Sequence, residues 1–198
     1  MDEKLSLGDG KKLVKLARKA IEYYCASGSL YSEKPPREKF TEKRGVFVTL
    51  NTHPEKKLRG CIGLPYPVKE LWTAVIEAAV SAAARDTRFP ALSSKEVKKV
   101  TVEVSVLTPP VKAKKSELPK SIKIGEHGII VERGSYSGLL LPQVATDFGW
   151  GNEAFLEQTC LKAGLFPDAW KLDDTVVKLF TAQVFSEQEP NGKVVEEM

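Results

Sequence analysis

The hexapeptide Leu58–Gly63, Leu-Arg-Gly-Cys-Ile-Gly, has the composition of a reactive thiol site. Cys61 stands between two glycines, and Arg59 lies two positions before it. A cysteine becomes nucleophilic when nearby positive charge lowers the pKa of its thiol, and neighbours without a Cβ let a ligand approach closely. Cys61 is therefore a candidate catalytic nucleophile, with Arg59, Gly60 and Gly63 as candidate ligand-binding residues. The alternative is that Cys61 is a small apolar residue in a tightly packed position.

Polar residues in or beside otherwise apolar segments could complete such a site. These further ligand-binding candidates are Arg85, Asp86, Arg88, Glu103, Ser105 and Gln143. The first three could hold an anionic group, or could form an ion-pair cluster within the protein. The next two lie on the polar face of a predicted strand, where they either line a site or face solvent. The last can both donate and accept hydrogen bonds, to a ligand or to the start of a helix.

A cysteine nucleophile usually works with a base, and the chain contains two histidines. His53 precedes a proline in a predicted turn, so we expect it at the surface. His127 lies between two predicted strands and is the better candidate of the two for a base; the alternative, which the residue type favours, is a loop histidine without chemistry. The sequence has no phosphate-binding loop, no dinucleotide glycine fingerprint and no cluster of metal ligands. It therefore identifies no cofactor and no metal site.

The spacing of apolar residues predicts the elements that must position these side chains. A helical pattern covers residues 13–25, with Ser6 as its N-cap and Gly28 at its end, and a longer helix is predicted over residues 67–84 with Pro67 at its first position. Shorter helices are predicted at 143–148 and 153–162. Alternating apolar residues predict strands at 45–51, 58–62, 100–107, 122–124, 128–132, 137–141 and 176–185. Residues 187–198 read as a frayed acidic tail.

These elements predict the fold class and the orientation of the hexapeptide. Strands and helices follow one another without a regular βαβ rhythm, which favours an α+β fold with a mixed, largely antiparallel sheet and flanking helices. Within the strand that begins at Leu58, alternation places Leu58, Gly60 and Ile62 on one face. We expect this face to point toward the core, and Arg59 and Cys61 to share the other.

Composition and charge narrow the function classes. The chain has 198 residues, of which 42% are hydrophobic and 28% charged, as in an ordinary globular domain. It lacks a secretion signal and an apolar run of about 20 residues, so we expect a cytoplasmic protein that does not bind membranes. The net charge of +4 comes from 30 basic and 26 acidic residues that are interleaved, which disfavours nucleic acid as a partner. The three cysteines lack CxxC spacing, so a disulfide framework and a zinc site are disfavoured.

The hexapeptide also resembles the signature of the AMMECR protein family, long described as uncharacterised. Further blocks similar to the family's occur in the same order at Ala82–Pro90, Val102–Leu107, Gly138–Ala145 and Phe155–Leu165, followed by Trp170. The resemblance implies a single AMMECR-type domain over residues 1–198, built of one larger and one smaller lobe with the shared motifs near the cleft between them. Prokaryotic members are associated with Memo-type proteins and radical SAM enzymes. This implies a shared modification or biosynthetic pathway.

Together, the motifs predict a cytosolic protein that binds a small anionic or nucleotide-like molecule in an interlobe cleft. Arg59, Cys61, Glu103 and Gln143 are predicted to line one cavity. The alternatives are a non-enzymatic protein-interaction module and a nucleic-acid-binding protein. The sequence leaves open whether the protein is an enzyme.

Overall fold

The structure is a computed structural model that describes residues 4–197. The chain divides into two compact units. The larger unit comprises the described residues up to Leu107 together with those from Gln183 onward, and the smaller unit comprises Thr108–Ala182. Strand β7 (Val176–Glu187) belongs to both units, because the division falls within it.

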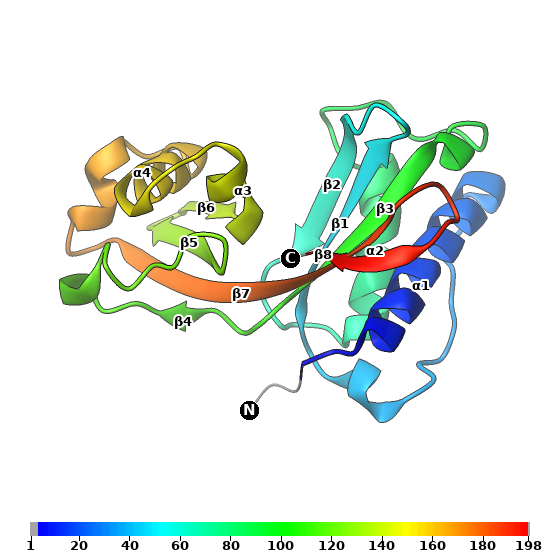
Figure 1. Cartoon of the computed structure of the whole chain (residues 1–198), viewed down its shortest axis with the longest axis horizontal. Coiled ribbons are helices and arrows are strands. Elements are labelled where there is room, and N and C mark those ends of the chain that lie inside the picture. The colour runs from blue at the N-terminus through cyan, green and yellow to red at the C-terminus, as the bar shows by residue number, and fades with distance from the viewer. Residues whose placement is uncertain (1–3, 198) are drawn as a thin grey trace. The chain divides into compact units, whose positions relative to one another are not determined.

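The larger unit is an antiparallel sheet with helices packed on one face. β1 (Gly45–Thr52) lies between β2 (Leu58–Leu64) and β3 (Val100–Leu107). β3 neighbours β7, and β8 (Val194–Glu197) pairs with the last residues of β7. Helices α1 (Leu7–Ser27) and α2 (Leu71–Ala84) cover this sheet (Figure 1). This unit also contains two short 3₁₀ helices, η1 (Glu38–Thr41) and η2 (Val97–Lys99).

Strand alternation builds the core of the larger unit. Three consecutive inward positions of β1 and three of β3 are buried and pack with the apolar faces of α1 and α2: Val46, Val48, Leu50, Val102, Val104 and Val106. The alanine-rich face of α2 brings that helix close to β1 and β2, because alanine side chains add little thickness. The opposite face of the sheet carries the polar residues of β1, β2 and β3.

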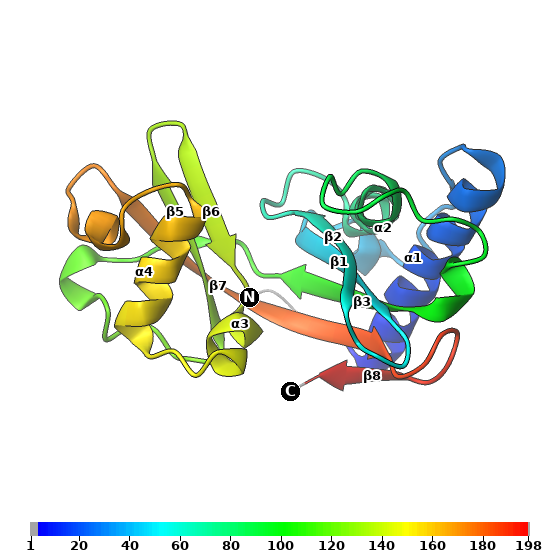
Figure 2. The same ribbon diagram turned by 90° about the horizontal axis from the view of Figure 1, so that it is seen from above.

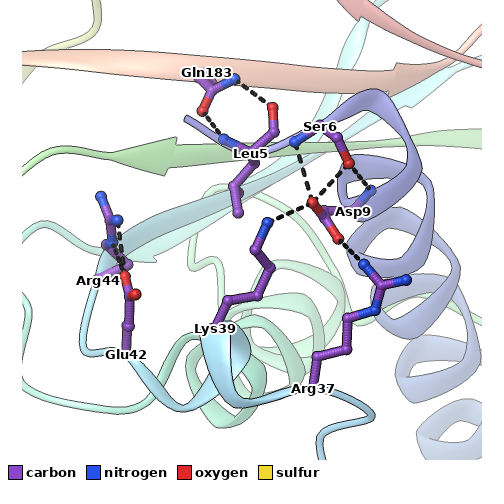
Figure 3. Close-up of polar contacts among 8 residues, drawn as sticks. All are labelled: Leu5, Ser6, Asp9, Arg37, Lys39, Glu42, Arg44 and Gln183. Atoms are coloured by element: carbon purple, nitrogen blue, oxygen red, sulfur yellow. Dashed lines mark hydrogen bonds and ion pairs between the residues drawn. The ribbon is translucent and has the colours of Figure 1, made fainter. Parts of the chain in front are cut away.

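Helix α1 begins at a capping box, which confirms Ser6 as the N-cap. The Ser6 hydroxyl accepts a bond from the Asp9 backbone N–H, and the Asp9 carboxylate accepts one from the Ser6 N–H. Lys39 donates to the same carboxylate at 2.9 Å, and Arg37 lies 3.6 Å from its other oxygen (Figure 3). The helix ends at Gly28, whose φ of 71° is the left-handed conformation that terminates helices.

Helix α2 begins at Leu71, so the prediction that it starts at Pro67 is wrong. The Leu71 N–H donates to the Glu42 carbonyl at 2.8 Å, and the Arg44 N–H donates to the Lys69 carbonyl. These bonds hold residues 69–70 in an extended bridge, which delays the first helical turn. A proline can open a helix, but here a pairing with a segment distant in sequence takes precedence.

Residues 187–197 do not form the predicted frayed tail, and Met198, the last residue of that prediction, lies outside the described residues. Residues 194–197 form β8 and pair with Val184–Glu187, and Val194 is buried. Glu187 itself is buried and accepts hydrogen bonds from Arg18 of α1 and from the Val102 N–H. The prediction treated the acidic residues of this segment as solvent-exposed, but the carboxylate of Glu187 is held inside the protein by Arg18.

The smaller unit has its own sheet and core. β4 (Val111–Lys112) and β5 (His127–Arg133) flank β7, and β6 (Tyr136–Leu140) pairs with β5. The helices are α3 (Pro142–Asp147) and α4 (Asn152–Lys162), with 3₁₀ turns η3 (Lys115–Glu117) and η4 (Pro167–Lys171). Helix α4 lies against β5 and β6 (Figure 2). Its Phe155 and Leu156 pack in a second buried cluster with Ile129 and Val131.

Residues 122–124 are irregular and lead into a turn, and they do not form the predicted strand. The Ile122 N–H donates to the Pro119 carbonyl, and the His127 N–H donates to the Lys123 carbonyl. Ile122 is buried in the core of the smaller unit, so its apolar character reflects burial and not sheet pairing. The predicted α+β class with a largely antiparallel sheet is otherwise confirmed: β1 pairs antiparallel with β2 and β3, β7 with β4, β5 and β8, and β5 with β6. No helix in residues 4–197 is long and apolar enough to cross a bilayer.

Candidate functional site

Cys61 lies on β2, the edge strand of the larger sheet, in a row of polar side chains. Thr49 of β1 is directly opposite both Cys61 and Glu103 of β3. Directly opposed residues point to the same face of a sheet, so these three side chains share the face away from the helices. The Thr49 hydroxyl lies 3.3 Å from the Cys61 sulfur, to which it donates a hydrogen bond, and Cys61 is half-buried.

The alternation predicted for β2 holds at Gly60, which is buried, but fails at Leu58. The pairing of β1 with β2 shifts between Leu50 and Asn51, so that Asn51 faces Leu58 and Leu50 faces Gly60. This irregularity turns Leu58 outward, and the residue is 41% exposed. The expectation that Leu58 faces the core is therefore wrong. A bulge, which the sequence does not reveal, re-aims the start of the strand.

Asp86 and Arg88 bind the backbone of Cys61 at the free edge of the sheet. The Cys61 N–H donates to Asp86 Oδ2 at 2.9 Å, and Arg88 Nη2 donates to the Cys61 carbonyl at 3.4 Å. The same arginine holds Asp86 in a bidentate pair, with Nε at 2.9 Å and Nη2 at 2.7 Å. The ion pair thus occupies the two backbone groups that an adjacent strand would otherwise bind.

The ion pair shifts the pKa values of both its members, so that each stays charged. Hydrogen bonds from Arg88 hold the pKa of Asp86 far below its usual range, against the opposing effect of burial, and the Cys61 N–H contributes in the same direction. The Asp86 hydrogen bond raises the pKa of Arg88, and attraction to the Cys61 thiolate adds to this effect. Asp86 is buried, whereas the Arg88 side chain is 55% exposed. A fixed cation therefore stands at the surface beside Cys61.

Arg59 joins this cluster through an aromatic ring. Its guanidinium lies 5.9 Å from the centre of Phe89, and the Arg88 guanidinium lies 5.4 Å from the same centre. Arg59 also pairs with Glu96 at 3.1 Å, and only 11% of its side chain is exposed. Arg85 is exposed, and its backbone N–H ends helix α2.

The two glycines of the hexapeptide allow the backbone of β2 to pack closely. A Cβ at Gly60 would lie 2.1 Å from the carbonyl oxygen of Ala82 in α2. A Cβ at Gly63 would lie 2.3 Å from the Val46 carbonyl oxygen and 2.4 Å from the Phe47 ring. Both contacts are with the protein itself. The predicted ligand-binding role of these glycines stays a prediction.

Glu103 and Ser105 occupy different surroundings on β3. Glu103 lines a polar cavity of about 380 Å³ together with Asn51, Thr101 and the buried Ser186, and no residue of the hexapeptide lines that cavity. Ser105 is fully buried, and its hydroxyl has no hydrogen-bond partner within residues 4–197. The cavity predicted to contain Arg59, Cys61, Glu103 and Gln143 stays a prediction.

The remaining candidates lie in the smaller unit. Gln143 is half-buried at the second position of α3, and the neighbouring Leu141 is the N-cap. His127 opens β5, and its Nδ1 accepts a bond from the Lys123 N–H at 3.2 Å. The other histidine, His53, is exposed in the larger unit, as expected. In the described part of the chain, no group of three or more His, Cys, Asp or Glu residues could hold a metal ion.

The other two thiols differ from Cys61 in their environment. Cys160 is fully buried in α4, and burial raises the pKa of its thiol. Burial also raises the pKa of Cys25, with Glu96 adding to the effect, and its sulfur donates to the Leu92 carbonyl at 3.2 Å.

Sequence reasoning missed two residues of the site, Thr49 and Phe89. Thr49 could have been found by aligning the predicted strands at 45–51 and 58–62 across their turn. Phe89 lies within the block Ala82–Pro90, but nothing in the sequence indicates that two guanidinium groups contact its ring.

The fold and the hexapeptide define a member of one protein family. The AMMECR1 family model matches residues 14–185, and this chain belongs to that family, which confirms the resemblance seen in its motifs. It is 53% identical over 200 residues to Protein MK0488 of Methanopyrus kandleri, covering 99% of this chain and 97% of that protein. It is 51% identical to Protein PF1979 of Pyrococcus furiosus, and the match covers 93% of this chain and 91% of that protein. The crystal structure of the uncharacterized protein PH0010 from Pyrococcus horikoshii matches with a TM-score of 0.93 and 46% identity, covering 100% of this chain and 99% of that one.

Proposed function

We propose that the β2 edge around Cys61 binds a small anionic or nucleotide-like molecule, with Cys61 as the nucleophile of a modification or biosynthetic reaction. The observation that carries the proposal is the position of Arg88, which is fixed to Asp86 and to the Cys61 carbonyl while its side chain remains 55% exposed. A guanidinium fixed in this way is pre-oriented for an anion beside the thiol.

The hydrogen-bonding capacity of the two arginines supports anion binding. Arg88 uses Nε and Nη2 for its contacts with Asp86 and Cys61, and Arg59 uses Nε and Nη2 for Glu96. A guanidinium carries five N–H donors, and these contacts use none of the N–H groups of Nη1 on either side chain. An anion could therefore bind without breaking either ion pair.

The surroundings of the sulfur support a nucleophilic role. The thiolate is the reactive form of cysteine, and nearby cations and hydrogen-bond donors stabilise it. Arg88 supplies the cation, and the Thr49 hydroxyl supplies the donor at 3.3 Å from the sulfur. A pathway shared with Memo-type and radical SAM proteins, as the family resemblance implies, is the setting that we propose for this chemistry.

Alkylation by a charged and an uncharged reagent tests both parts of the proposal. In each case the thiolate sulfur displaces iodide and forms a C–S bond, but iodoacetate carries a carboxylate and iodoacetamide does not. We expect Cys61 to react faster than Cys25 and Cys160, as measured by peptide mass mapping after brief treatment. We also expect the iodoacetate-to-iodoacetamide rate ratio at Cys61 to exceed that of free cysteine and to fall several-fold in Arg88→Gln.

Lys171→Gln is the matched control, because Lys171 is a half-exposed cation of the smaller unit that pairs with Asp168. It should leave the ratio unchanged. If Cys61 reacts no faster than the other two thiols, the nucleophile part of the proposal is wrong. A fast reaction with a rate ratio that Arg88→Gln does not alter would instead contradict the anion site.

A further inference from the structure

A second cavity, of about 350 Å³, lies within the smaller unit. Its lining residues all fall between Thr108 and Thr181, and its volume is within the range of small-molecule sites. We propose that this cavity binds a small carboxylic acid anion with an apolar chain, and that it does so independently of Cys61.

The apolar wall of the cavity follows from the register of three strands. Leu179 of β7 is directly opposite Val111 of β4 on one side and Ile129 of β5 on the other. These residues therefore share one face, on which Ile129 is fully buried and Leu179 packs against the core. Val111 is 69% exposed. The apolar wall of the cavity thus continues the core face of the sheet, and at β4 this face is exposed to solvent.

His127 places a hydrogen-bond donor on the same face. It is directly opposite Thr181, which is two residues beyond Leu179 in β7. Its Nδ1 accepts the Lys123 N–H, so the proton of the neutral ring is on Nε2. Both His127 and Thr181 line the cavity. The half-buried imidazole can therefore donate to a ligand.

Ser121 supplies a second polar group, which the protein itself does not satisfy. Ser121 lines the cavity, and its buried hydroxyl has no hydrogen-bond partner in the part of the chain that the structure describes. Leaving a buried hydroxyl unpaired is unfavourable, because it loses its hydrogen bonds to water without gaining others. A ligand acceptor would remove this penalty.

The charge of the lining selects an anion. Lys112 and Lys114 line the cavity. The lining also includes one carboxylate, that of Glu117, which already pairs with Lys114 at 3.0 Å. Two cations thus stand against one carboxylate. An ionised carboxylate only accepts hydrogen bonds, which matches the donors of His127 and Ser121.

Hexanoate is the probe for this site, and hexanamide is its uncharged counterpart of the same shape. Each is titrated into the ¹⁵N-labelled full chain while amide chemical shifts are followed. Hexanoate should give saturable shifts confined to residues 108–127 and 179–181, and hexanamide should bind at least several-fold more weakly. His127→Phe removes the donor and should raise the dissociation constant for hexanoate about tenfold. His127→Gln restores an N–H and should stay within about threefold of the unmodified chain.

The other histidine gives the matched control, because His53→Phe makes the same change at an exposed position of the larger unit. It should leave hexanoate binding unchanged. Should His127→Phe not fold, Ser121→Ala removes one unpaired hydroxyl and gives the same measurement, again with weaker binding expected. Shifts that do not saturate, equal binding of hexanamide, or an equal loss in His53→Phe would each overturn the proposal.

Discussion

The carboxylate of Asp86 accepts the backbone N–H of Cys61 at 2.9 Å, although the two residues belong to different elements. Cys61 is on the edge strand β2, and Asp86 follows the end of α2. Side chains bind the backbone in a similar way elsewhere in the larger unit, where the Gln183 amide bonds both the N–H and the carbonyl of Leu5 (Figure 3). The backbone of Cys61 is therefore held by Asp86, while its sulfur accepts a hydrogen bond from Thr49 of the neighbouring strand.

Replacing Asp86 by Asn should destabilise the protein by about 1–3 kcal/mol, because the change removes a buried charge that binds both Arg88 and the Cys61 N–H. The free energy of unfolding from denaturant titration measures this. Asp168→Asn is the control, since that carboxylate is 59% exposed and pairs with Lys171, and its effect should stay within about 0.5 kcal/mol. Equal effects of the two substitutions would show that the Asp86 contacts contribute no more than a surface pair.

Gly60→Ala should destabilise the larger unit by about 1–3 kcal/mol, because the new Cβ would lie 2.1 Å from the Ala82 carbonyl oxygen and force α2 away from β2. Gly8→Ala is the matched control in α1, where the nearest atom to a new Cβ is 3.6 Å away. It should be neutral or stabilise the protein by up to about 1 kcal/mol. Thermal unfolding of both variants makes the comparison, and a stable Gly60→Ala variant would argue against close packing of α2 on β2.

The protein should become less stable as the pH is lowered, partly because Asp9 becomes protonated. Burial alone would raise the pKa of Asp9, but hydrogen bonds from Ser6 and Lys39 outweigh it and lower the pKa from 3.8 to about 2. A lowered carboxyl pKa stabilises the folded state above the unfolded-state value, and this contribution, about 2 kcal/mol, is lost as the pH falls from about 4 through 2. The difference in unfolding free energy between the unmodified chain and Asp9→Asn should shrink over that window. A constant difference from pH 5 to pH 2 would contradict this assignment.

Polynucleotides should bind weakly. The net charge is only +4, and basic side chains pair with carboxylates in both units, as Lys69 does with Glu77 and Arg133 with Asp174. Non-specific affinity depends on concentrated positive charge. We expect a dissociation constant weaker than about 1 μM for a short single-stranded RNA in fluorescence anisotropy at physiological salt. A tighter value that falls steeply with added salt would favour the nucleic-acid-binding alternative.

Local signals predicted those elements whose ends are determined locally. Ser6 and Gly28 mark the ends of α1, and clean alternation gave β3 its observed bounds, Val100–Leu107. The start of α2 and the existence of β8 depend on partners far away in the chain, at Glu42 and in β7, so no local pattern could reveal them.

The candidate site could be predicted only as separate parts. The sequence drew attention to Cys61, Asp86 and Arg88 individually, because a thiol flanked by glycines and a charged cluster after an apolar helix are both unusual. Their contact arises because the end of α2 meets the edge of β2, which is a tertiary relationship. Thr49 and Phe89 are ordinary residue types whose roles depend entirely on that arrangement.

The chain leaves the larger unit after β3 and returns to it along β7, so the smaller unit is an insert in the sequence of the larger one. The two ends of the insert are hydrogen-bonded neighbours: the Thr108 N–H donates to the Thr181 carbonyl at 3.0 Å, and the Thr181 N–H donates to Thr108 Oγ1 at 2.9 Å. An insert whose ends meet can be lengthened, shortened or exchanged while the strands that flank it keep their register. A change of length within the smaller unit can therefore be absorbed where its two ends meet, without moving the strand that carries Cys61.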